Sequence, residues 1–177
     1  TAVRWMRAHA RELRIDSFHI AALGHSAGGQ LVALMGATNR NPEFEGKSSW
    51  LQHRSEVQAV VDIDGILAFI HPESGEGDEA KRVSAGTWWF GYTAKERPDI
   101  WQQASALTHV GPEFPPFLFL ASSVDRMHAG RDDLIRQLNQ FGIYTEQYTF
   151  DGAPHSFPLF HPWFLPMVDK IDAFLKK

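Results

Sequence analysis

Cysteine is absent from the 177 residues, which excludes disulfides and thiolate metal ligands. No apolar run approaches the roughly 20 residues that cross a bilayer, and the first residues carry no apolar signal core. Basic residues are outnumbered, with 17 Lys and Arg against 21 Asp and Glu, for a net charge of −4. This balance is unsuited to nucleic acid or to an anionic membrane surface. We therefore expect no nucleic-acid partner and no membrane association.

Apolar and charged residues make up 44% and 21% of the sequence, the balance of a globular protein. Helical spacing of apolar residues predicts a helix over 2–13. Short apolar segments bounded by turn residues predict four strands, and helical patterns fill most of the intervals between them. The expected strands are 17–24, 57–64, 117–122 and 145–150, and the further helices are 27–37, 98–104, 129–141 and 163–176.

Strands that alternate with helices predict an α/β fold, with a parallel sheet flanked by helices and right-handed crossovers. In such sheets the reactive groups gather at the carboxyl ends of the strands. The candidate reactive residues are therefore those that follow each predicted strand.

The segment Gly24-His25-Ser26-Ala27-Gly28 has the pattern G-x-S-x-G between a predicted strand and a predicted helix. That context is typical of a nucleophile elbow, in which a tight turn exposes the serine hydroxyl. The two glycines are expected to remove side chains where strand and helix would collide. The Ala27 N–H is expected to donate to an oxyanion. A glycine-rich turn with an incidental serine is the alternative.

A serine nucleophile needs a histidine base, which in this topology comes last in the order serine, acid, histidine. Nine histidines are available, and His155 lies in the loop after the last predicted strand. His25 sits inside the elbow and should point away from Ser26, His128 should crowd the acid, and His161 should open the final helix. We therefore expect His155 to be the base.

Three aspartates compete for the role of the acid. Asp125 follows the third predicted strand and satisfies the chain order, so it is the expected acid. Asp64 ends the second predicted strand and could reach the same histidine from a neighbouring position, although it could equally cap the following turn. Asp151, beside the histidine loop, is the weaker candidate.

The segments 24–33 and 152–157, together with Asp125, resemble the α/β-hydrolase serine esterases. The similarity is greatest to the acetyl-xylan and feruloyl esterase group of carbohydrate esterases. The resemblance implies Ser26, Asp125 and His155 as nucleophile, acid and base, acting on a small-molecule or polysaccharide ester. It implies no cofactor and no metal.

One part of that family's pattern is missing. The family has a His-Gly-Gly loop, which supplies further oxyanion donors, and additional strands before the nucleophile strand. The chain is therefore expected to be the C-terminal portion of an α/β-hydrolase, forming a single catalytic domain over 1–177. A missing N-terminal segment or a second chain is expected to complete the sheet.

The interval 66–97 lies where these folds place lids, and we expect a lid-like insertion there. Trp88, Trp89 and Phe90 within it suit either an apolar wall or a platform for sugar rings. A lid packed on its own small core is an equal alternative. Trp88, Trp89 and His25 are the expected substrate-binding residues.

The sequence thus predicts a serine esterase that removes acetyl or feruloyl groups from plant polysaccharides through an acyl-enzyme. Two alternatives remain open. One is a serine peptidase of the prolyl-oligopeptidase type, which shares the order of the triad. The other is an inactive fragment that serves as a binding or assembly module.

Overall fold

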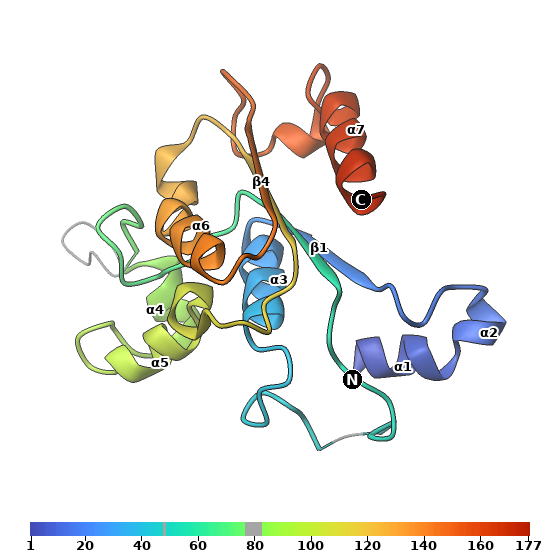
Figure 1. Cartoon of the computed structure of the whole chain (residues 1–177). Helices are drawn as coiled ribbons and strands as arrows, with labels where there is room; N and C mark the ends of the chain where they lie inside the picture. Colours follow the sequence, from blue (N-terminus) through green and yellow to red (C-terminus); the bar gives the residue numbers. More distant parts are fainter. Residues whose placement is uncertain (48, 77–82) are drawn as a thin grey trace.

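The computed structural model describes residues 1–47, 49–76 and 83–177. Within these residues four parallel strands form one sheet in the order β1-β2-β3-β4, as expected (Figure 1). Residues 77–82 of the expected lid-like insertion lie outside the described part. The strands are β1 Ala21–His25, β2 Ala59–Ile63, β3 Phe117–Ala121 and β4 Thr145–Thr149.

The helices follow the predicted ranges closely, except that the first divides at His9 and a short helix lies inside the interval 66–97. The α-helices are α1 Ala2–Ala8, α2 Ala10–Leu13, α3 Ala27–Ala37, α4 Ala85–Phe90, α5 Pro98–Gln103, α6 Arg131–Gln140 and α7 Phe164–Leu175. Three 3₁₀ turns join them: η1 Ala106–His109, η2 Asp125–His128 and η3 Phe157–Leu159. No helix in the described residues is long and apolar enough to cross a membrane.

The first strand begins later than predicted. Asp16 accepts hydrogen bonds from the Phe18 N–H and from the His19 ring, so the residues before Ala21 form a turn. Short polar side chains favour such local bonds over a strand ladder.

The sheet separates two apolar layers (Figure 1). Alternate residues of a strand face opposite sides, so Phe117 and Phe119 pack with α3 and α6, whereas Leu118 and Leu120 pack with α7. All four side chains are almost fully buried. Burial of this kind is the main stabilising contribution to such a sandwich.

Register fixes which residues meet at the carboxyl edge of the sheet. Gly24 lies opposite Asp62, and His25 lies opposite Ile63. The next residues on these two strands, Ser26 and Asp64, therefore leave the sheet side by side. The Ser26 N–H still donates to the Ile63 carbonyl at 2.8 Å.

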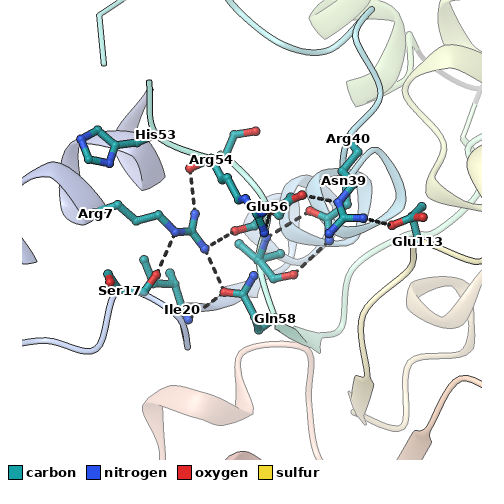
Figure 2. A network of polar contacts seen from close by, with 12 residues as sticks. Arg7, Ser17, Ile20, Asn39, Arg40, His53, Arg54, Glu56, Gln58 and Glu113 are labelled. Atoms are coloured by element: carbon teal, nitrogen blue, oxygen red, sulfur yellow. Dashed lines mark hydrogen bonds and ion pairs between the residues drawn. The ribbon is translucent and has the colours of Figure 1, made fainter. Parts of the chain in front are cut away.

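Arg7 fastens α1 to the segments that lead into β1 and β2 (Figure 2). Its guanidinium donates to the carbonyls of Ser17, Arg54 and Glu56, at 2.8 to 2.9 Å, and to Oε1 of Gln58 at 2.9 Å. The planar fork of arginine serves several acceptors at once, which the single ammonium of lysine cannot reproduce.

We expect Arg7→Lys to lower the free energy of unfolding by about 1–2 kcal/mol, because carbonyls are left without donors. Urea unfolding of the variant and the parent measures the change. Arg11→Lys, on the exposed side of α2, is the control and should be neutral. Equal effects of the two substitutions would contradict the assigned role of Arg7.

Candidate active site

The turn between β1 and α3 holds Ser26 in an unusual backbone conformation. Its φ is 59° and its ψ is −119°, a region that non-glycine residues rarely occupy and that costs about 1–3 kcal/mol. The turn is possible because Gly24 and Gly28 come very close: a Cβ on Gly24 would lie 2.2 Å from the Gly28 carbonyl oxygen. The expected collision therefore applies to Gly24.

The second crowded glycine of the turn is Gly29 rather than Gly28. A Cβ on Gly28 would meet nothing within 4 Å, whereas one on Gly29 would lie 2.2 Å from Oδ1 of Asp62 and 2.9 Å from Cα of Gly65. The first turn of α3 thus packs its backbone directly against the end of β2. Gly29 follows the G-x-S-x-G pattern, which ends at Gly28, so the pattern did not predict its role.

His155 connects the two other polar groups of the site. Its Nε2 lies 2.8 Å from Oγ of Ser26, and its Nδ1 lies 2.9 Å from Oδ2 of Asp64. A carboxylate only accepts, so Nδ1 carries the proton and donates to Asp64, which leaves Nε2 to accept from the serine hydroxyl. The result is a continuous line of two hydrogen bonds, as in a catalytic triad.

The expectation that Asp125 is the partner of this histidine is wrong. Asp125 is exposed at the start of η2, several residues beyond the end of β3. Asp64, the alternative candidate, takes the position because it follows β2, the strand next to the one that carries Ser26. Asp151 is also exposed.

Asp64 is held firmly at the base of the site. Its side chain is fully buried, and Oδ1 accepts from the Ser122 N–H at 2.7 Å. Burial by itself raises the pKa of this carboxyl, but contacts with His128, Ser122 and His155 outweigh it, so the pKa lies below its usual range. Asp64 is therefore a carboxylate at neutral pH.

His25, an expected substrate-binding residue, contacts the loop of His155 in the structure. Its Nε2 donates to the carbonyl oxygen of His155 at 2.8 Å, and the two rings lie 4.8 Å apart. His25 is also outside the set of residues that line the cavity described below. Its role is to hold the loop that carries His155.

Ser26 and His155 open onto a cavity of about 290 Å³ with a mostly apolar wall. Ala27 lies beside Ser26 in this wall, and because it opens α3 its N–H has no acceptor within the helix. This N–H is suited to donate a hydrogen bond to an oxygen that gains negative charge next to Ser26. The other lining residues are Gln30, Leu31, Ile66, Phe69, Glu76, Ala85, Gly86, Trp89, Arg126 and Met127.

The structure separates the aromatic residues of α4. Trp89 lines the cavity while remaining mostly exposed, and Trp88 is equally exposed but does not line it. Phe90 packs edge to face on Phe69 and also contacts Trp101. Of the two expected tryptophans, only Trp89 is therefore at the site.

His25, Asp64 and His155 also offer potential metal-ligand atoms within 4.8 Å of one another. Each of these side chains is already committed to a hydrogen bond of normal length. Metal ligands instead leave their lone pairs converging on a common point about 2 Å away. The hydrogen bonds of this cluster do not suit a metal site.

Comparison with known proteins identifies the family of the chain. Residues 1–131 match the BD-FAE family model. The chain belongs to the BD-FAE family. The expected α/β-hydrolase fold is confirmed by similarity to a truncated carbohydrate esterase from gut microbiota, with a TM-score of 0.76 and 22% identity, covering 99% of this chain and 66% of that one.

Two relatives from Mycobacterium tuberculosis are esterases by name. Esterase LipC is 32% identical over 71% of this chain and 30% of its own length. The probable carboxylic ester hydrolase LipM is 30% identical over 85% of this chain and 36% of its own length. This BD-FAE chain thus spans about a third of the length of the curated relatives that it matches.

Sequence reasoning missed three residues around the acid of this BD-FAE site. Ser122 acts on Asp64 through its backbone N–H and also through its side chain, and a serine after a strand has no specific sequence signature. His128 was considered only beside Asp125, and in the structure its Nε2 lies 3.7 Å from Oδ1 of Asp64. Asp62 lies inside a predicted strand, where a buried carboxyl has no local sequence signature.

We expect Gly29→Ala to lower the free energy of unfolding by about 2 kcal/mol or more, because its Cβ would overlap Asp62. Gly28→Ala is the matched control. It should be neutral or stabilising by up to about 1 kcal/mol, since alanine favours helix and its Cβ meets open space. Thermal or urea unfolding decides. If Gly29→Ala is as stable as Gly28→Ala, the close packing of α3 on β2 is refuted.

Asp62 gives a prediction about pH. Its complete burial raises the pKa of this carboxyl well above the usual range; the Gly65 N–H and Arg131 oppose the rise, and nearby Asp64 adds to it. The folded protein therefore keeps a proton that the unfolded chain releases above about pH 4. This carboxyl consequently makes stability fall as pH rises towards its folded pKa.

We expect Asp62→Asn to remove that part of the pH dependence. Its stability relative to the parent should improve progressively from pH 4 to pH 8, as measured by urea unfolding at several pH values. Asp132→Asn, at an exposed position, should leave the difference from the parent constant. A difference between Asp62→Asn and the parent that does not change with pH would rule out a retained proton on Asp62.

Proposed function

We propose that this chain is the catalytic part of a carboxylic ester hydrolase. The observation that carries the proposal is the line from Ser26 Oγ through His155 to Asp64, with hydrogen bonds of 2.8 and 2.9 Å. Ser26, at one end of this line, is held in a strained turn and lines a cavity. Relatives named as ester hydrolases support the same reaction class.

The proposed mechanism is acyl transfer in two stages. Oγ of Ser26 attacks the ester carbonyl carbon while Nε2 of His155 takes its proton, and Asp64 stabilises the imidazolium that forms. The Ala27 N–H donates to the tetrahedral oxyanion. Collapse breaks the bond to the alcohol, which leaves with the proton from Nε2. Water, activated by the same nitrogen, then releases the acid and restores Ser26.

We propose that the substrate is an acylated plant polysaccharide, from which acetyl or feruloyl groups are removed. The apolar cavity next to Ser26 is suited to an acyl group. Trp89, exposed at its rim, offers a flat face of the kind on which sugar rings stack. The interval 66–97, which supplies this tryptophan, would act as the lid-like insertion. The name of the gut carbohydrate esterase is consistent with such a substrate.

We propose that the remaining oxyanion donors come from a segment outside these 177 residues. Ala27 is the backbone donor that directly follows Ser26 at the start of α3 and lines the cavity. Along β1, Leu23 is about half exposed, and an apolar residue on a strand edge is normally covered. An N-terminal segment of the same protein, or a second chain, would complete the sheet there.

Substitution of the two aspartates tests the proposed triad. We expect Asp64→Asn to lower kcat for p-nitrophenyl acetate by about 10³–10⁴-fold, because the imidazole loses its orientation and its counter-charge. Asp125→Asn should stay within about 3-fold of the parent, since its carboxyl lies outside the site. The reverse result would restore Asp125 as the acid and overturn the geometry described above.

Ser26→Ala is the reference for all these assays, which use both this chain and the longer protein that contains it. Ester hydrolysis that disappears in Ser26→Ala supports the proposed function. Release of acetate from acetylated xylan supports the proposed substrate. Turnover of a prolyl peptide in place of esters would favour a peptidase. No turnover dependent on Ser26 in either form would leave a binding module.

A further inference from the structure

Two buried nitrogens near the site lack hydrogen-bond partners. Among the described residues, the buried side-chain atoms in this condition are Nε2 of His128 and Nη1 of Arg131. Both residues line the same small cavity of about 10 Å³, together with Asp62 and Asp64. Buried polar groups are normally paired, because an unpaired one costs about 1–3 kcal/mol. Two such atoms behind one carboxylate call for a functional explanation.

His128 faces the oxygen of Asp64 that the base does not use. Its Nε2 lies 3.7 Å from Oδ1, whereas His155 binds Oδ2. The distance is too long for a hydrogen bond. The contact is shielded from water, because the side chain of Asp64 is fully buried and that of His128 is only 14% exposed. Electrostatic interactions are stronger in such surroundings than in water.

We propose that His128 is a positioning residue for the acid of the triad, an inference that rests on the proposed function. The Ser122 N–H binds Oδ1 at 2.7 Å and the His128 imidazole attracts the same oxygen from 3.7 Å, which turns Oδ2 towards Nδ1 of His155. His128 also keeps Asp64 ionised at acidic pH, consistent with the lowered pKa of that carboxyl. Asp64 can then support a charged His155 throughout the catalytic cycle.

The charged groups around His128 come from three elements. Asp64 and Asp62 face it from the end of β2, and Arg131 faces it from the start of α6. On its own element, η2, Asp125 and Arg126 are exposed. Burial raises the pKa of Asp62 well above its usual range, whereas the pKa of Asp64 is lowered.

The test compares His128→Leu and His128→Gln in the full-length protein. Loss of the imidazole in His128→Leu should lower kcat about 10-fold with KM within about 2-fold, because the change reorients the acid and not the substrate. The acidic limb of the pH profile of kcat/KM should move up by about half a pH unit or more, since Asp64 becomes easier to protonate.

His128→Gln retains an N–H donor and should recover kcat to within about 3-fold of the parent. His109→Leu is the control: this partly buried histidine binds the Gln103 carbonyl and should leave kcat and the pH profile unchanged. A His128→Leu variant that loses thermal stability but keeps the parental pH profile would show a purely structural role and overturn the inference.

A fluorophosphonate probe separates this inference from the proposed function. If Ser26 of the parent does not react with the probe at neutral pH, the proposed function fails and the inference fails with it. If the parent reacts and His128→Leu reacts at the same rate, the proposed function stands and the inference is wrong. We expect the parent to react and the variant to react about 10-fold more slowly.

Discussion

The site depends on one close contact, between the first turn of α3 and the end of β2. Gly29 brings its backbone so near that a single added Cβ would overlap Asp62 and Gly65. Because α3 starts this close to the sheet, the chain has to reverse direction within the turn after β1, and Ser26 takes up a positive φ. The same contact sets the position of β2, whose next residue is Asp64. One backbone contact thus fixes the positions of both Ser26 and Asp64.

Asp62 and Asp64 are separated by one residue, yet they have opposite electrostatic properties. Asp62 has its Oδ1 bound by the Gly65 N–H at 2.8 Å, and burial keeps its pKa high. Asp64 is equally hidden from solvent, but its surroundings supply a backbone N–H and two imidazoles, and its pKa is lowered. Burial therefore does not decide the charge of a carboxyl; the number and direction of donors around it do.

The parts of the site that sequence could predict are those encoded within a few residues. The segment 24–28, between a predicted strand and a predicted helix, predicted the turn, and chain order identified His155 from among nine histidines. The acid was different, because Asp64 and Asp125 both follow predicted strands and both satisfy the rule. The deciding factor is the path of the chain after β3, where the Ser123 N–H bonds to the Ala153 carbonyl at 2.9 Å and η2 carries Asp125 into solvent. That bond joins segments 30 residues apart and leaves no local trace.

The loop that carries His155 shows why a histidine on an irregular segment can still be placed accurately. On one side, the Ala153 carbonyl accepts from Ser123; on the other, Phe157 is fully buried in the layer under α7. Between them, His25 binds the His155 carbonyl. The backbone on both sides of the imidazole is therefore fixed by groups from β1, β3 and the core, and only χ rotations remain. The hydrogen bond from Nδ1 to Asp64 restricts these rotations, so Nε2 faces Ser26 without a bound substrate. Preorganisation of this kind lowers the reorganisation that a reaction would otherwise require, and here it comes from the sheet itself rather than from the loop.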